Sequence, residues 1–302
     1  MYEDQVPVAG IQPRPQRRTR GRGTIIRAGL HWQGKGTLVE QLVGLSVDSA
    51  GRGCIYTILE RSDPPLSALK RTRKELQGLY ASQRPGLDLQ VEKAFQHEYI
   101  QRFFTDDGKG NGRLILRRGF LLLSGNPWDI LVRLLTFRLP DRKTVVWRID
   151  TFFDALQRFS RLEPASMDYE ERSQAIRQLS ESCTMLRMVA PACEQLIQQY
   201  WRHHTAQTAM IAIIAIMEYQ REHGLYPSDL DQLVEAGHLE AKPIDPYSGK
   251  PFLYRQTADG FLLYSVGQDR KDDGGVRGTD EHGRPIVWAE DGDWVFWPWL
   301  YH

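Results

Sequence analysis

The sequence predicts an α+β fold, with a mostly helical N-terminal region followed by a long helix that packs on a small three-stranded antiparallel sheet. Apolar residues recur every three to four positions as far as about residue 190, which is helical spacing. Residues 209–219 are apolar almost all round, as in a helix that is covered on more than one side. Short runs rich in aromatic and branched residues, separated by Gly, Asp and Pro, follow and indicate strands.

We expect three parts along the 302 residues: a disordered basic tail (1–27), a helical domain (28–190) and an α+β module (191–302). Residues 10–27 carry six arginines among Pro and Gly, a composition that cannot bury a core. The formal net charge is +1, and the tail lacks interleaved aromatic residues. We therefore expect no nucleic-acid partner.

The chain also has no sequence signal for a membrane. Its first ten residues have neither a basic start nor an apolar run of signal-peptide length. Its longest uninterrupted apolar run, residues 209–217, is far shorter than the roughly 20 residues of a membrane span. We expect no membrane span and no signal peptide in the chain as it stands.

The three cysteines, Cys54, Cys183 and Cys193, do not have the spacing of a metal site. Two interpretations stay open for the last two. Either both are buried as small apolar side chains, or they form a disulfide across a break in the helical sequence near Pro191.

Five helices are expected in the N-terminal region. The first begins after Thr37, which is suited to an N-cap, and the others cover residues 67–81, 91–103, 142–162 and 169–185. We expect their apolar stripes to face a common core, including the four-residue repeat of Val91, Phe95, Tyr99 and Phe103. Short loops favour antiparallel packing of these helices.

The second part begins with a long helix that Gly224 ends, with Pro227 just beyond. Ser228 is expected to cap a short helix. Strands follow at residues 251–254, 261–266 and 294–297, and residues 258–260 form a hairpin turn between the first two. A tryptophan cluster at the last strand is more typical of a small core than of a carbohydrate or partner platform; its members are Trp294, Trp297 and Trp299.

The loop after the second expected strand has the most distinctive chemistry. In the stretch FLLYSVGQDRKDDGG (261–275), the strand is followed within a few positions by Asp269, Asp272 and Asp273. Clustered carboxylates repel one another unless a cation lies among them, and Ca²⁺ is bound by oxygen ligands of this kind. The alternative is a solvated acidic turn, because Arg270 and Lys271 dilute the charge. An EF-hand fits poorly, since Lys271 would occupy a ligand position.

An ordered series of segments surrounds this loop: AIMEYQREHG (215–224), LYPSDLDQLVEAG (225–237), DPYSGKPFLY (245–254), DGFLLYSVGQD (259–269), DDGG and GDWVF (292–296). Through this series the last third of the chain resembles the soluble part of the major pseudopilin of type II secretion, and a group of uncharacterised bacterial envelope proteins. The resemblance implies a non-enzymatic structural or interaction protein of the periplasm or cell envelope, linked to type II secretion and with protein partners.

The resemblance also implies a structural calcium ion in the loop before the last strand. Its ligands would be the Val266 carbonyl, Asp269 and Asp293, with further candidates at Asp272, Asp273 and Asp291. The insertion at residues 276–290 leaves open which aspartate closes the site. The family also begins with a hydrophobic membrane anchor, which this chain lacks. Either an upstream anchor is missing, or the module is used without assembling a fibre.

The alternative function is a hydrolase or nucleotide-handling enzyme with its site in the N-terminal helices. Its support is the segment GLHWQGKG (29–36), which satisfies GxxxxGK but places Gly36 where a phosphate loop needs Ser or Thr. Acidic residues at Glu98, Asp106 and Asp107 add weak support. We find no complete catalytic constellation in the sequence.

Two further motifs in this region are incomplete. His97 and Glu98 begin like a zinc-protease helix, but the second His position is occupied by Gln101. The segment TDDGKGNGR (105–113) resembles a calcium loop, but Lys109 occupies a ligand position, and we expect a tight Gly-rich turn there.

Overall fold

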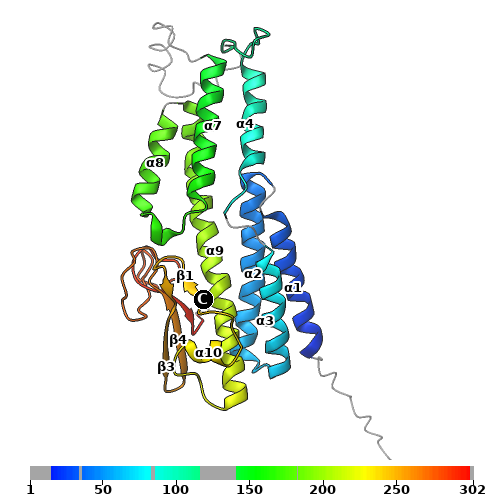
Figure 1. Cartoon of the computed structure of the whole chain (residues 1–302), viewed down its shortest axis with the longest axis vertical. Helices are drawn as coiled ribbons and strands as arrows, with labels where there is room; N and C mark the ends of the chain where they lie inside the picture. Colours follow the sequence, from blue (N-terminus) through cyan, green and yellow to red (C-terminus); the bar gives the residue numbers. More distant parts are fainter. Residues whose placement is uncertain (1–14, 34–35, 83–85, 116–140, 182, 300–302) are drawn as a thin grey trace, which may run out of the picture.

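The computed structural model describes residues 15–33, 36–82, 86–115, 141–181 and 183–299. The molecule is elongated, and the 40-residue helix α9 (Thr184–His223) runs along most of its length (Figure 1). Helices α7 and α8 lie beside the first half of α9. Beside the second half, helices α1 to α3 lie on one side and the sheet lies on the other (Figure 1). The predicted α+β class is confirmed.

The remaining helices, in chain order, are α1 (Pro15–Trp32), α2 (Leu38–Arg61), α3 (Leu66–Ala81), α4 (Gln90–Phe103), α7 (Arg142–Phe159), the 3₁₀ helix η2 (Pro164–Ser166), α8 (Tyr169–Glu181) and α10 (Asp231–Glu235). Thr37 caps α2 as predicted: its side chain accepts from the Glu40 N–H, while the Glu40 carboxylate accepts from the Thr37 N–H at 2.7 Å. Gly224, at φ 77°, ends α9 as predicted. Ser228 does not cap α10; the Asp229 carboxylate accepts from the Asp231 and Gln232 N–H groups instead.

The disordered basic tail predicted for residues 1–27 is wrong from Pro15 onward, where α1 begins; residues 1–14 lie outside the described residues. Helix α1 packs closely on α2 because glycines remove side chains from the contact. A Cβ placed on Gly44 of α2 would lie 2.7 Å from the Gly29 carbonyl oxygen of α1. Ile26 of α1 is fully buried in the same contact region. Composition alone did not reveal this tertiary support.

The boundary predicted at residues 190 and 191 is not a break in the helix. Pro191 lies inside α9, although it removes one backbone donor there. The helix continues because Cys193, Leu196 and Ile197 are buried just beyond the proline. Cys183 and Cys193 are both free and buried, so the disulfide interpretation is wrong and the small-hydrophobe interpretation is confirmed. Burial raises the pKa of the Cys193 thiol to about 12.

Helix α4 reverses the expected orientation of its apolar stripe. Val91, Phe95 and Tyr99 are exposed, with Phe95 at 44%, whereas the buried residues of α4 are Glu92, Gln96 and Ile100. Glu92 is held inward because its carboxylate accepts from the Leu38 N–H of α2 at 3.3 Å and from the Gln96 amide at 3.0 Å. The expectation of a core-facing stripe is therefore wrong for this helix.

The sheet has the predicted three antiparallel strands in the order β3 (Leu253–Thr257), β4 (Gly260–Ser265) and β5 (Trp294–Trp297). The turn predicted at residues 258–260 joins β3 to β4, with Thr257 opposite Gly260. A separate pair, β1 (Ile244–Asp245) and β2 (Lys250–Pro251), precedes the sheet. The expected first strand thus begins two residues later than predicted.

The tryptophan cluster belongs to the core, as expected. Trp294 is fully buried, and its indole N–H donates to the Ala289 carbonyl at 2.9 Å. The Trp297 ring stacks on Phe261 of β4 at a centroid distance of 5.6 Å. The Trp299 ring stacks on Tyr56 of α2 at 4.0 Å, so the end of the sheet region contacts the N-terminal helices.

The apolar stretch of α9 is the centre of this core. Its side chains from Ala212 to Ile216 are fully buried, as an all-round apolar helix requires. Helices α2 and α3 contact α9 on one side and the strands β4 and β5 on another, which confirms the predicted double cover. Within the described part of the chain, no helix combines the length and apolar character needed to cross a membrane.

Two buried polar networks fix α9 against its neighbours. The fully buried Glu218 carboxylate accepts from the Arg73 guanidinium of α3 at 2.9 and 3.0 Å, and it lies 3.3 Å from His238 Nδ1. In the second network, between α2 and α9, Asp48 of α2 contacts Arg52 and accepts from the Gln207 amide of α9 at 3.1 Å. Burial acts to raise the pKa of Asp48, but Arg52 beside it holds that pKa below its usual range.

We expect Glu218→Gln to lower the free energy of unfolding by about 3 kcal/mol, because it leaves the Arg73 charge buried without its partner. Urea denaturation measures the change. Glu170→Gln breaks the exposed ion pair with Arg177 and serves as the control, with an expected change within about 0.5 kcal/mol. Equal losses in the two variants would contradict the importance of burial.

Two alanine substitutions on α2 should act in opposite directions. Gly44→Ala places a methyl group against the Gly29 carbonyl and should cost about 1–3 kcal/mol of unfolding free energy. Gly53→Ala meets no atom within 4 Å and should stabilise by up to about 1 kcal/mol through helix propensity. Thermal melts of both variants check this; a stabilised Gly44→Ala would rule out the close α1–α2 approach.

Candidate metal centre

The candidate metal loop joins β4 to β5 and spans residues 266–293. Gly267 turns the chain directly after Val266, with φ 69°. Near the other end of the loop, the Asp293 N–H donates to the Val276 carbonyl at 2.8 Å. The insertion at residues 276–290 folds on itself as a small hairpin, with Thr279 opposite Pro285. Asp280 holds the tip of that hairpin by accepting from the His282 and Arg284 N–H groups at 2.9 Å.

Asp293 is the central side chain of this loop. The residue is fully buried, and its Oδ2 accepts from the Gly275 N–H at 2.7 Å and from the Asp273 N–H at 3.1 Å. Its Oδ1 is buried and has no hydrogen-bond partner among the residues that the structure describes. Burial, together with the negative charges of Asp272 and Asp273, raises the pKa of Asp293 to about 6.

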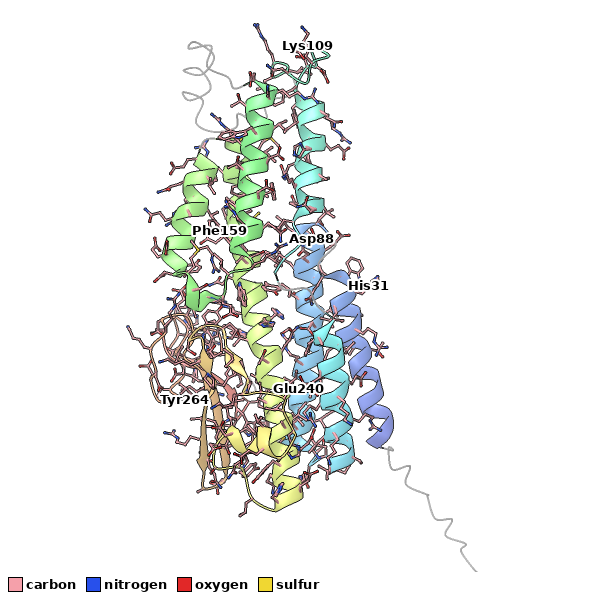
Figure 2. All side chains as sticks on the ribbon, viewed as in Figure 1. His31, Asp88, Lys109, Phe159, Glu240 and Tyr264 are labelled. Atoms are coloured by element: carbon pink, nitrogen blue, oxygen red, sulfur yellow. The ribbon has the colours of Figure 1, made fainter. Side chains whose placement is uncertain are left out.

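The other candidates divide into two groups. Asp272 and Asp273 are exposed and lie near enough to Asp293 to repel its charge. Asp272 Oδ1 also accepts from the Tyr264 hydroxyl of β4 at 3.1 Å, and Figure 2 places Tyr264 at the sheet side of the molecule. These contacts bring three of the predicted aspartates to one side of the loop.

Asp269 and Asp291 are placed differently. Asp269 Oδ1 accepts from the Lys271 N–H at 3.1 Å, which is a local turn contact. Asp291 is exposed and lines a groove with Arg202 and Tyr169. Val266 is buried at the end of β4, where its backbone contacts the Asp245 carboxylate. The strand register, with Ser265 opposite Trp294, brings the Val266 backbone next to Asp293, whereas the contacts of Asp269 and Asp291 do not place those carboxylates beside it.

Asp245 is not among the site residues that the sequence predicts. The structure buries its carboxylate behind the end of β4, where Oδ1 accepts from the Ser265 hydroxyl at 2.9 Å and from the Tyr247 N–H at 3.0 Å. Burial raises the pKa of Asp245. Its burial at the end of β1 was not visible from the sequence, because β1 contains only two residues.

The donor set fits a calcium ion in part. Asp293 offers a buried oxygen without a partner, and two more carboxylates lie nearby on an exposed loop. The described residues contain no group of three acidic, histidine or cysteine side chains already gathered as a metal site. Side chains of Asp272 and Asp273 would have to turn toward Asp293 to complete one, which their exposure allows.

The residues cited for an enzyme in the N-terminal helices make other contacts. His97 Nε2 lies 2.9 Å from Asp150 of α7, Glu98 pairs with Arg102, and Asp106 pairs with Arg142 at 2.6 Å. The segment before residues 29–36 is helical rather than a strand, and Lys35 lies outside the described residues. No phosphate-loop geometry is therefore visible in the described part of this segment.

The predicted tight turn at residues 105–113 is confirmed. The Thr105 N–H donates to the Arg113 carbonyl at 2.9 Å, and Asp107 Oδ1 accepts from the Lys109 and Asn111 N–H groups at 2.8 and 2.9 Å. Lys109 lies at one end of the molecule, far from the sheet (Figure 2). The Asp107 carboxylate is thus used to hold the turn.

Comparisons of the chain with protein-family models, with curated proteins and with solved structures gave no match. The pseudopilin resemblance therefore stays a prediction that rests on the quoted segments and on the shared α+β class.

Proposed function

We propose that this chain is a non-enzymatic structural or interaction protein whose pseudopilin-like C-terminal module is stabilised by a bound calcium ion. One observation carries the proposal: Asp293 Oδ1 is buried without a partner beside two further carboxylates. A buried carboxylate is costly unless a cation or donors offset its charge. A hard divalent cation supplies that offset and prefers oxygen ligands.

In this proposal, Asp293 anchors the ion from the sheet while Asp272 and Asp273 approach it from the loop. The resemblance adds the Val266 carbonyl, Asp269 and Asp291 as further ligands. Bound calcium would hold residues 266–293 against the ends of β4 and β5, and it would favour the folded state by mass action. Its contribution is therefore to stability rather than to chemistry on a substrate.

The wider role in the proposal rests on the resemblance. It places the protein in the periplasm or cell envelope, links it to type II secretion and gives it protein partners. The elongated arrangement along α9 supports a structural role, because one rigid helix connects the sheet to the opposite end of the molecule (Figure 1).

A thermal melt in excess EDTA, in millimolar Ca²⁺ and in equal Mg²⁺ tests the proposal. Calcium at about 100 times its dissociation constant should add about 2.7 kcal/mol of stability, which shifts the melting temperature upward by several degrees. Magnesium should act weakly, because it demands tighter octahedral geometry than a long loop provides. Identical melting temperatures in all three solutions would contradict calcium binding.

Asp293→Asn should remove the calcium-dependent shift while leaving the calcium-free protein at least as stable as the wild type. The amide keeps the shape of the side chain and loses the buried negative charge that Asp272 and Asp273 repel. Asp280→Asn is the matched control, because this aspartate lies in the same loop and holds only the insertion hairpin. A full calcium shift in Asp293→Asn would exclude Asp293 as a ligand.

Asp269→Ala separates the ligand set implied by the resemblance from the one that the contacts favour. If Asp269 binds the ion, calcium affinity and the calcium-dependent rise in melting temperature should both fall. Calorimetric titration of calcium into the variant and the wild type measures the affinity. An unchanged affinity would leave Asp272, Asp273 and Asp293 as the core of the site.

A further inference from the structure

A second charged cluster lies where η2 and α8 meet α9 and the end of β4. It contains three arginines that come from separate parts of the chain: Arg172 of α8, Arg202 of α9 and Arg270 of the loop after β4. Two of them, Arg172 and Arg270, line a cavity of about 20 Å³. Arg202 lines the adjacent groove of about 860 Å³, which shares Tyr169 and Gln198 with the cavity.

These arginines have no carboxylate partner at ion-pair distance in the described residues, although the more distant charge of Glu290 acts on Arg202. None of the three forms an ion pair with a carboxylate in the described ranges, and Nε of both Arg172 and Arg202 is buried without a partner there. Arg172 is only 6% exposed, and its Nη2 donates to the Leu162 carbonyl at 3.1 Å. Burial lowers the pKa of Arg172, and the nearby charge of Arg270 lowers it further.

The two other arginines that are almost fully buried in the described residues are paired with carboxylates. Arg52 is paired with Asp48, and Arg73 is paired with Glu218. Because a buried unpaired charge is costly, the exception at Arg172 needs a source of negative charge. Glu194 is the acidic side chain among the described lining residues of the cavity, but it accepts from the Ser173 hydroxyl and lies outside ion-pair distance of Arg172.

The other two guanidinium groups are held in place by neutral partners. Arg270 adopts a left-handed backbone conformation, φ 60°, and its Nη2 donates to the carbonyls of Pro164 and Met167, the latter at 2.9 Å. Strain of this kind is retained only where the surroundings fix it. Arg202 donates to the Gln268 amide oxygen at 3.3 Å and lies 5.5 Å above the Trp294 ring. These contacts position the charges without cancelling them.

We propose that the cavity between Arg172 and Arg270 binds one oxyanion group, a carboxylate or a phosphate, with the remainder of its bearer in the groove beside Arg202. The cavity, at about 20 Å³, has room for about one water-sized atom, so it admits one oxygen of such a group. Guanidinium groups recognise these oxygens with charge-assisted hydrogen bonds. Glu290 and Asp291 line the outer groove and disfavour a bearer with further negative charge there.

Thermal melts and calorimetric titrations with sodium acetate and with sodium phosphate test this site, with sodium chloride at equal ionic strength as the reference. At least one oxyanion should raise the melting temperature above the chloride value. Saturable binding of acetate in the titration identifies a carboxylate ligand, and saturable binding of phosphate alone identifies a phosphate ligand, because phosphate can raise the melting temperature without binding. Equal melting temperatures in all three salts would overturn the proposal.

Arg172→Gln should weaken the responding anion by about tenfold or more, because it removes a charged donor. Arg177→Gln, on an exposed position of the same helix, should leave the affinity unchanged. Without added oxyanion, Arg172→Gln should be at least as stable as the wild type, since the substitution removes an unpaired buried charge. A loss of stability as large as in Glu218→Gln, or an unchanged anion affinity, would show that Arg172 has a structural role and would overturn the proposal.

Discussion

Glu218 places a carboxylate at a position with no access to solvent, and this fixes how the molecule is assembled. Its carboxylate must meet Arg73 of α3 on one side and His238, beyond α10, on the other. The buried Asp48 carboxylate likewise needs its partners, Arg52 of α2 and Gln207 of α9. Apolar contacts along α9 tolerate small shifts, whereas these pairs do not, because a displaced charge would be buried alone. The pairs therefore set the register of α9 against α2 and α3.

Local sequence rules predicted the elements whose stability is local. Thr37 and Gly224 mark helix ends through contacts within a few residues, and the turn between β3 and β4 needs only its own residues. The helix break predicted at Pro191 was wrong. The lost backbone hydrogen bond is a local cost, whereas the burial that offsets it comes from neighbouring helices. The same holds for α1, whose support is the glycine contact with α2 rather than its own composition.

Helix α4 shows a different limit of pattern reading. Periodicity detected the apolar stripe of α4 but not the direction in which it faces. The opposite face turns inward because the Glu92 carboxylate accepts a hydrogen bond from the Leu38 N–H of α2. At the candidate metal loop, the sequence predicted that aspartates gather; the charges of Asp272 and Asp273 do act on Asp293, but the three side chains do not form a finished metal site. The position of Asp291 depends on the path of the inserted hairpin, and this residue lines a groove instead. Arg172 and Arg270 form a cluster only through tertiary structure, since almost a hundred positions separate them in the sequence.

The long helix also has a consequence for how the chain acquires its structure. Arg73 and its partner Glu218 are 145 positions apart in the sequence, and Asp48 and its partner Gln207 are 159 positions apart. Contacts with such large sequence separation slow folding, because a long loop must close before they form. During synthesis, α1, α2 and α3 emerge long before the second half of α9, so their inward faces stay uncovered for that interval. The N-terminal helices are thus the stretch on which a chaperone acting during translation has the longest time to bind.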